Sequence, residues 1–312
     1  MVKKKIFKSF LYKNWLRPEN GPIDYFKSQS WTDINLKKFK NKLDLCCGDG
    51  TNIFLSSEGE LGEDFDLYID TKAGQFSHSK FIDIYDSVTK NFSPTIKKKA
   101  KIPFEVGLDM KKNLLIKASK LKVFKRLVLH DINKIPLPFV NNEFDFIHSN
   151  SVYWIKNSRQ LIKDLGRIMQ KDGTAVIQVA TKYFLKTLYD MKNILDKKAF
   201  KVLDRKRSTS MKNINLDRFY WEKCFRDGNF TIEDIRNTWP NQLITDLWAV
   251  GLSRPIAHLL IQMANNLPKE KRKKIKKEWV NICYDILKPI CEKPKKLAIN
   301  NSPYITYILK KN

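Results

Sequence analysis

Apolar residues between positions 42 and 180 form short continuous runs that alternate with segments of helical spacing. The run at 42–45 ends in Gly48 and Gly50, and a short helical pattern follows it. Further strands are predicted at PFEVGLD, which ends at Asp109, RLVLHD, which ends at Asp131, FDFIHS, from Phe144, and TAVIQVA, after a turn at KDG. Helices are predicted over Lys111–Lys122 and around Leu161–Ile168. Strands alternating with helices are typical of parallel βαβ units and an α/β sheet.

The rest of the chain has a different pattern. Residues 56–103 contain several Gly and Pro residues and two aromatic, strand-like pieces, FDLYID and FIDIYD. After Thr181 the pattern is mostly helical, with a helix over 241–266 interrupted at Pro255 and another from Lys269. Strand patterns return at 230–235 and in the final PYITYILKK. We therefore predict a helical N-terminal cap at 1–41 and one domain at 42–312, with an insertion at about 56–103 and a helical insertion at about 241–292.

Composition limits the class of protein. The chain has 312 residues, of which 42% are hydrophobic and 29% charged, which is enough apolar material for a core and argues against disorder. No stretch approaches the ~18 apolar residues of a membrane span. No signal peptide pattern follows the basic start. Five irregularly spaced cysteines predict neither a disulfide framework nor a zinc site, and no metal is expected. We expect a cytoplasmic protein.

The net charge of +26 raises the question of an anionic partner. Of the 59 basic residues, 48 are lysines and only 11 are arginines, the residue that binds phosphates and bases through two parallel hydrogen bonds. We interpret most of the lysines as solvated surface. Both ends of the chain are basic, however, so an anionic acceptor or surface stays open and nucleic acid is a possible but not favoured partner.

Four segments occur in an order that identifies a family. LDLCCGDGTN, VGLDM, LHDINKIPLPFVNNEFDFIHSN and LGRIMQKDGTAVIQV together resemble the class I S-adenosylmethionine-dependent methyltransferases, in particular the type 11 branch, over residues 42–180. The resemblance implies a Rossmann-like sheet of seven mostly parallel strands with helices on both faces. It also implies S-adenosyl-L-methionine as methyl donor and S-adenosyl-L-homocysteine as product.

The resemblance also implies the site residues. In the family, the glycine turn holds the methionine moiety, an acid after the second strand binds the ribose, an acid after the third reaches the adenine, and the end of the fourth strand faces the methyl group. The cofactor-binding residues expected here are Asp44, Cys46, Gly48, Gly50, Asn52, Asp109, Met110, Asp131, Ile132, Ser149 and Asn150. Transfer mainly needs alignment, and an oxygen acceptor also needs a base. The candidate bases are His148 and Tyr153.

Two departures from the family pattern matter. Cys46 replaces the first glycine of the turn, and Asp109 follows Asp44 by 65 residues, far more than is usual. Asp70, at the end of FDLYID, has the ordinary spacing from Asp44. We choose Asp109 because one helix and one strand fit between it and Asp131, whereas Asp70 would leave strand-like pieces with no crossover helix.

Structural interpretations compete with several of these assignments. Asp44 and Asp131 could cap local turns, and His130 and His148 lie within strand patterns, as core histidines do. The tryptophans at 221, 239, 248 and 279 have helix-face spacing that favours core positions. A dinucleotide fingerprint G-x-G-x-x-G is not met, because position 53 is Ile, so a nicotinamide or flavin enzyme is disfavoured.

Three functions remain after this comparison. The first is methyl transfer to an O, N or C nucleophile of a small molecule, such as a sugar, a lipid precursor or a secondary metabolite. The second is methylation of RNA or protein, with the basic ends binding the substrate. The third is a cofactor-binding protein without catalysis, since the three acids argue only for binding. The sequence leaves the oligomeric state open.

Overall fold

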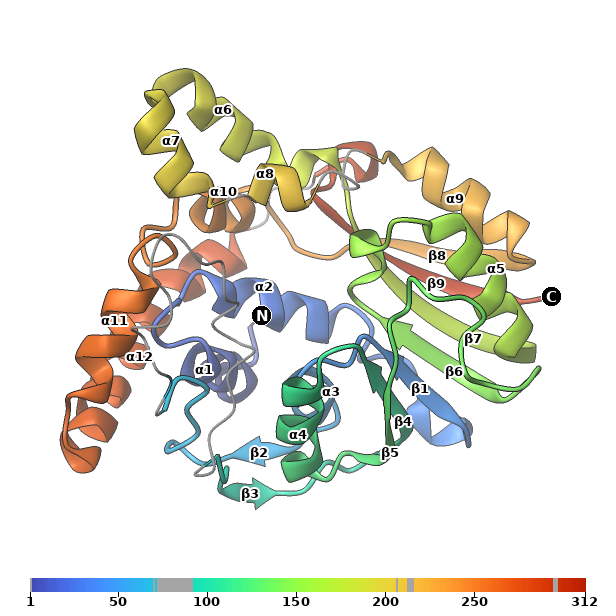
Figure 1. Ribbon diagram of the computed structural model, residues 1–312, viewed down its shortest axis with the longest axis horizontal. Coiled ribbons are helices and arrows are strands. Elements are labelled where there is room, and N and C mark those ends of the chain that lie inside the picture. The colour runs from blue at the N-terminus through green and yellow to red at the C-terminus, as the bar shows by residue number, and fades with distance from the viewer. Residues whose placement is uncertain (1, 70, 72–91, 206, 212–215, 294–296) are drawn as a thin grey trace.

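One sheet of seven strands runs through the molecule in the order β5-β4-β1-β6-β7-β9-β8 (Figure 1). The structure is a computed structural model and describes all residues except 1, 70, 72–91, 206, 212–215 and 294–296. The strands are β1 Lys42–Leu45, β4 Phe104–Asp109, β5 Phe124–Leu129, β6 Phe144–Ser149, β7 Met169–Ala180, β8 Phe230–Asn237 and β9 Tyr304–Lys311. The pairs among β5, β4, β1, β6 and β7 are parallel, and β9 is antiparallel to both β7 and β8. The predicted mostly parallel sheet is confirmed.

Helices cover both faces of this sheet (Figure 1). Alternate residues of each strand point to opposite faces, so each strand contributes side chains to both layers. Leu43 and Ile147 pack on the face covered by α5 and α9, whereas Phe146 and Val176 pack on the face covered by α1, α2, α3 and α12. The helices are α1 Lys4–Lys13, α2 Asn20–Gln29, α3 Thr51–Ser56, α4 Lys112–Leu121, α5 Ser158–Ile168, α6 Lys186–Ile194, α7 Lys197–Asp204, α8 Arg207–Ser210, α9 Arg218–Asp227, α10 Leu243–Val250, α11 Ala257–Asn265 and α12 Lys269–Glu292. Short 3-10 turns are η1 Leu36–Lys38, η3 Val152–Trp154, η4 Lys182–Leu185 and η6 Ile299–Asn301.

The second strand of the core is β4, as the choice of Asp109 required. It pairs in parallel with β1, where Asp44 lies opposite Gly107 and Leu45 opposite Leu108. The helix α4 then returns the chain to β5, the edge strand beside it. The predicted crossover between Asp109 and the third strand is therefore present.

Three local predictions were wrong. KDG is not a turn before a strand but lies within β7, where Asp172 adopts a positive φ of 61° and the pairing with β6 shifts register. Asp131 lies two residues beyond β5, which ends at Leu129. Residues 65–69 of FDLYID do not form a strand: Phe65 and Tyr68 are buried, and residues 67–69 form a turn. The strands near it are β2 Glu60–Leu61 and β3 Ile96–Lys98, which pair with each other. FIDIYD lies outside the described residues.

The N-terminal helices share a core with the sheet. Phe7, Phe10, Leu11 and Trp15 are at most 2% exposed and belong to the same apolar cluster as Phe146 of β6 and Val280 of α12. The N-terminal segment is helical, as the pattern indicated, and it is packed into the body of the molecule. The boundary at residue 41 stays a prediction.

A buried carboxylate joins the segment after α1, the helix α12 and the segment that follows β2. Asp66 Oδ2 accepts hydrogen bonds from Trp15 Nε1 at 3.1 Å and from Arg272 Nε at 3.0 Å, and it lies 4.0 Å from Lys276 Nζ. Lys276 also donates to the backbone oxygen of Phe65. Because two cations share one buried acid, one positive charge stays uncompensated within this group.

Lys276 should make stability depend on pH. Burial lowers the pKa of its ammonium group from 10.5 to about 8, although the charge of Asp66 opposes this. The unfolded chain then binds the proton more tightly than the folded chain, so stability is lowest below pH 8 and is regained as pH rises toward 10.5. We expect wild type to gain about 2 kcal/mol relative to Lys276→Met between about pH 7.5 and 9.5, measured by urea unfolding. A difference that is constant over this range would contradict the prediction.

Candidate functional site

The turn after β1 opens the carboxyl edge of the sheet. Cys46, Gly48 and Gly50 all have positive φ, of 60°, 58° and 74°, and the backbone N–H of Cys47 donates to the carbonyl oxygen of Leu108 at 2.9 Å. A Cβ built on Gly48 would meet nothing within 4 Å, whereas one on Gly50 would lie 3.2 Å from Ala118 Cβ. The turn therefore has open space on the side of Gly48 and close packing on the side of Gly50.

Asp109 lies against this turn from the end of β4. Its Oδ2 accepts the backbone N–H of Gly48 at 3.0 Å, and its Oδ1 accepts that of Lys111 at 2.9 Å. The side chain is largely buried, and burial raises the pKa of the carboxyl above its ordinary value, although the two backbone N–H groups oppose this. Each oxygen keeps a further acceptor position, which is what two neighbouring hydroxyls would require.

Asp44 and His148 form a buried pair between β1 and β6. His148 Nδ1 and Asp44 Oδ1 are hydrogen-bonded at 2.6 Å, and the two residues are register partners in the sheet. The Trp31 ring covers the imidazole at a centroid distance of 4.7 Å, and Nε2 has no hydrogen-bond partner. Burial raises the pKa of the Asp44 carboxyl. In this arrangement neither His148 nitrogen is open to solvent, since the residue is 1% exposed.

Polar groups at the end of β6 contact both β1 and β9. Ser149 Oγ donates to the backbone oxygen of Leu45 at 2.8 Å, which ties β6 to β1. The backbone oxygen of Asn150 accepts from the Tyr304 hydroxyl at 2.6 Å, and the Tyr153 and Tyr304 ring centroids lie 5.7 Å apart. Both tyrosines are buried.

Lys27 reaches these tyrosines from α2. Its Nζ lies 3.5 Å from the Tyr153 hydroxyl and 4.6 Å from the centre of the Tyr304 ring. The end of the same helix is held to the sheet, because Gln178 Nε2 donates to the backbone oxygen of Lys27 at 3.0 Å. No sequence pattern indicated Lys27, because an isolated lysine on a helix is usually interpreted as solvated surface.

The remaining predicted residues lie around the same edge. Asp131 Oδ1 accepts both the backbone N–H and the side-chain amide of Asn133, and these bonds lower the pKa of its carboxyl. Asp131 therefore caps the local turn through Oδ1, and neither of these bonds involves Oδ2. Ile132 is buried, whereas the side chain of Met110 is 57% exposed directly after β4. Asn52 Oδ1, on the first turn of α3, is buried without a hydrogen-bond partner.

The two cysteines of the turn are not arranged as reactive or metal-binding groups. Burial and the nearby carboxylates raise the pKa of both the Cys46 and the Cys47 thiol, so both stay protonated. Among the residues that the structure describes, no three His, Cys, Asp or Glu side chains are grouped as a metal ion would require.

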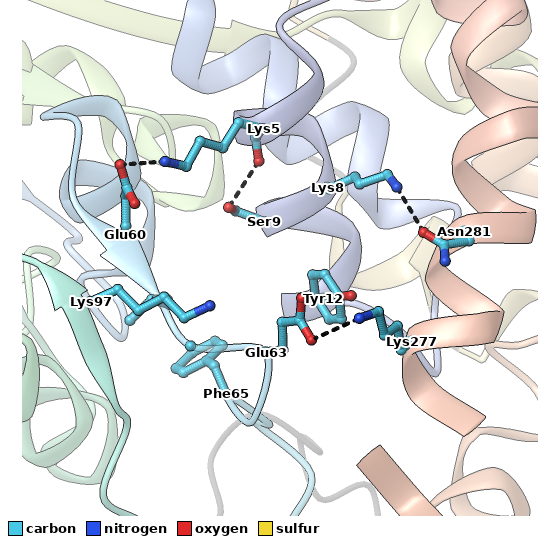
Figure 2. A pocket seen from close by; sticks show the side chains of 12 residues that line it. Lys5, Lys8, Ser9, Tyr12, Glu60, Glu63, Phe65, Lys97, Lys277 and Asn281 are labelled. Atoms are coloured by element: carbon cyan, nitrogen blue, oxygen red, sulfur yellow. Dashed lines mark hydrogen bonds and ion pairs between the residues drawn. The ribbon is translucent and has the colours of Figure 1, made fainter. Parts of the chain in front are cut away.

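A separate cavity of about 380 Å³ lies between α1, β2 and α12, and Figure 2 shows its lysines. Lys5 pairs with Glu60 at 2.7 Å, Lys277 with Glu63 at 3.6 Å, and Lys8 donates to Asn281 Oδ1 at 2.7 Å. None of the predicted site residues lines it. Two of its four lysines, Lys5 and Lys277, pair with acids, whereas the hydrogen bond of Lys8 to a neutral amide leaves its charge in place.

A parallel sheet with a glycine turn after β1 and acids after its neighbouring strands defines an α/β enzyme that binds its ligand outside the carboxyl ends of the strands. Residues 92–177 match the family model of a methyltransferase domain, which spans Asp109, Asp131 and Ser149 but begins after the glycine turn. Together with the strand order, this match shows that the chain contains a methyltransferase domain. It is an enzyme whose methyl donor is S-adenosylmethionine.

Similar solved structures show only distant likeness. A methyltransferase of Thermotoga maritima is 12% identical, with 98% of each chain covered and a TM-score of 0.49. The YcgJ protein of Bacillus subtilis is 14% identical over 87% of this chain and 92% of that one, with a TM-score of 0.40. A TehB-like methyltransferase of Corynebacterium glutamicum is 11% identical over 87% and 80%, with a TM-score of 0.40. No curated protein matches the chain in sequence.

The geometry fits the cofactor at three points. The space beside Gly48, the unused acceptor positions of Asp109 and the exposed Met110 all lie at the same edge of the sheet, after β1 and β4. A methionine chain, a ribose diol and a flat adenine ring require these three kinds of surface. The residues present are therefore compatible with S-adenosylmethionine.

Proposed function

We propose that the enzyme methylates an O, N or C nucleophile of a small-molecule acceptor. The observation that carries this proposal is the contact of Lys27 with Tyr153 and Tyr304, because it closes α2 over the end of β6. A small acceptor can lie beside these groups, whereas a folded RNA or protein surface would have to displace α2.

In this proposal the chain binds and orients both substrates. The turn at 46–50 and Asn52 hold the methionine moiety, Asp109 the ribose, and Met110, Asp131 and Ile132 the adenine. S-adenosylmethionine, when bound, supplies an electrophilic methyl group, and displacement at that carbon depends mainly on alignment. Ser149 and Asn150 form the floor below it. The Asp44–His148 pair fixes β1 to β6 beneath the turn, so we assign it a positioning role.

Tyr153 is the candidate that remains for acceptor chemistry. Its hydroxyl is hydrogen-bonded to a lysine and lies beside the end of β6, where His148 is covered by Trp31. The neutral hydroxyl can orient the acceptor's nucleophile, and only the phenolate, after the hydroxyl has given its own proton to solvent, can take the acceptor's proton. Lys27 then acts through Tyr153 and through the charge it presents to the acceptor.

The acceptor class is tested by transfer of a labelled methyl group. The enzyme is incubated with labelled S-adenosylmethionine and, separately, with the small-molecule, RNA and protein fractions of one cell extract. We expect label in the small-molecule fraction only. Label in RNA or protein would refute the proposal. Cofactor binding without transfer to any fraction would favour the non-catalytic alternative.

Lys27→Met should lower kcat/KM for the acceptor by about tenfold, because a hydrogen bond with a charged partner contributes ~1.5 kcal/mol. Cofactor affinity should stay within about twofold, since Lys27 contacts the tyrosines and not the turn. Tyr153→Phe should show the same division between acceptor and cofactor. Lys37→Met, at an exposed position on η1, is the matched control and should leave both unchanged. Equal losses of cofactor affinity would show that Lys27 only supports the fold.

A further inference from the structure

Exposed apolar side chains are concentrated in one part of the molecule. Among the described residues, 17 large hydrophobic side chains are exposed, and eight of them lie between positions 250 and 286. They are Val250, Leu252, Ile256, Leu259, Met263, Trp279, Ile282 and Ile286. Val250 ends α10, and the other seven belong to α11, α12 and the segment before α11; α11 and α12 lie at the left edge of the view in Figure 1. Soluble surfaces rarely gather so many apolar groups without a partner.

These side chains form rows along the helices. On α12, Trp279, Ile282 and Ile286 are spaced by three and four residues and are 37%, 54% and 59% exposed. The opposite side of the helix is buried through Val280 and Leu287. From its spacing, Trp279 was predicted to lie in the core. This prediction was wrong, because α12 is apolar on two sides and only one of them packs against the rest of the protein.

α11 carries a second row beside the first. Ile256, Leu259 and Met263 are 42%, 47% and 67% exposed, whereas Ala257 and Ile261 are buried. The two helices are joined where α11 ends and α12 begins, because Arg272 Nη1 donates to Asn265 Oδ1 at 2.7 Å. Asp66 in turn fixes Arg272 to the body of the molecule. The two rows are therefore held in place.

The same surface is strongly basic at the start of α12. Lys269, Lys271, Lys273 and Lys274 are exposed, and within the part of the chain that the structure describes none of them forms an ion pair. Residues 269–277 contain seven basic side chains and one acid. Further along the helix Glu278 and Asp285 are exposed, so the charge is greatest at the N-terminal half and the apolar row at the C-terminal half.

Three kinds of partner can be compared with this arrangement. A second copy of the chain would bring two proteins of net charge +26 together, with four unpaired lysines on each. A nucleic acid would pair with the lysines but would leave the isoleucine and methionine rows without contact. An anionic lipid surface satisfies both, because apolar side chains enter the boundary of the acyl chains while lysines remain among the headgroups.

We propose that α11 and α12 form a surface that binds an anionic phospholipid bilayer from one side. The lysines of 269–274 meet the headgroups, and Trp279, Ile282, Ile286, Leu259 and Met263 enter the interface. In the described part of the chain, no helix is long and apolar enough to cross a membrane. This proposal is independent of the acceptor and would stand if methyl transfer to a small molecule were disproved.

Vesicle flotation tests the proposal with the full-length chain. One set of vesicles is phosphatidylcholine alone, and the other also contains about 30% phosphatidylglycerol. We expect the protein to float with the anionic vesicles and only weakly with the neutral ones. Ile282→Ser/Ile286→Ser should reduce binding by about tenfold, because it removes the apolar contact. The fourfold change of Lys269, Lys271, Lys273 and Lys274 to Gln should reduce it by at least about tenfold.

Matched variants control for charge and for hydrophobicity. Lys37, Lys40, Lys120 and Lys171 are also exposed, and changing all four to Gln removes the same charge elsewhere. Val140→Ser/Phe219→Ser removes two apolar side chains that are 70% and 64% exposed. Both controls should bind vesicles within about twofold of wild type. Thermal unfolding verifies that each variant is folded, and the single change Ile282→Ser replaces the double variant if the latter unfolds.

Three outcomes would overturn the proposal. Equal losses in the test and control lysine variants would show diffuse electrostatic attraction rather than a surface on α12. Unchanged vesicle binding by Ile282→Ser/Ile286→Ser, together with conversion of a wild-type dimer to a monomer in light scattering, would show a self-association face. Absence of binding to anionic vesicles, with RNA binding lost in the fourfold α12 variant, would assign the lysines to nucleic acid.

Discussion

Asp109→Ala should weaken S-adenosylmethionine binding by more than about 30-fold. The carboxyl is held at the end of β4 by the N–H groups of Gly48 and Lys111, so it is already oriented before a ligand arrives. Hydrogen bonds to a charged acceptor contribute ~1.5 to 3 kcal/mol each and do not add fully, which gives about 2–4 kcal/mol for a ribose diol. The substitution also releases the turn at Gly48. Isothermal titration calorimetry measures the loss.

Two further substitutions make this result specific. Asp109→Asn keeps one acceptor oxygen and should lose less affinity than Asp109→Ala. Asp70→Ala should change affinity by less than about threefold, since Asp70, which lies outside the described residues, is not at the end of β4. Unfolding curves separate lost binding from lost stability. If Asp70→Ala had the larger effect, the ribose would be bound by the insertion rather than by the second strand.

Asp66→Ala should lower the free energy of unfolding by about 3–5 kcal/mol. Removing this carboxylate leaves the buried guanidinium of Arg272 and the buried ammonium of Lys276 without their counter-charge. It also leaves Trp15 Nε1 without its acceptor. An unpaired buried charge costs more than the ion pair itself contributes, so the loss is larger than for a surface acid. Urea unfolding at pH 7 measures it.

Asp64 supplies the control for this substitution. It is exposed and accepts a hydrogen bond from Thr95 Oγ1 at 2.6 Å, so Asp64→Ala should cost less than about 1 kcal/mol. Adding Lys276→Met to Asp66→Ala should recover part of the lost stability, because it removes one unpaired cation. Equal losses at positions 64 and 66, or no recovery in the double variant, would show that Asp66 does not balance these charges.

The central sheet could be predicted because its signals are local. Each strand from β4 to β7 contains a short apolar run, and the helix α4 has its own periodicity, so Asp109 could be assigned to a strand end without the fold. FDLYID has the same alternation as a strand, yet its described residues do not form one, because Asp66 is held by Trp15, after α1, and by Arg272 of α12. That contact joins residues 51 and 206 positions apart, which no local pattern contains.

Only the part of the site that lies in or directly after the strands could be predicted from the sequence. The glycine turn and the acids within β1, at the end of β4 and beyond β5 follow from their order, but the partner of each side chain does not. From its strand alone, His148 is compatible with a base or with a core residue. Its pairing with Asp44 can be recognised only when the register of β1 against β6 is known. Lys27 belongs to the site because α2 crosses the sheet near β7, and an unremarkable lysine gives no sign of that path.

The position of β9 constrains the order in which the chain can mature during synthesis. Among the described strands, β8, at 230–237, pairs with β9 alone, so it must wait for residues 304–311 before it can pair. The hydroxyl of Tyr304, the first residue of β9, also completes the end of β6 through Asn150. The strands from β5 to β7 can assemble while the ribosome is still adding the helices. Translation must therefore reach the final strand before the acceptor side of the enzyme exists, so a stalled nascent chain would hold the cofactor half alone.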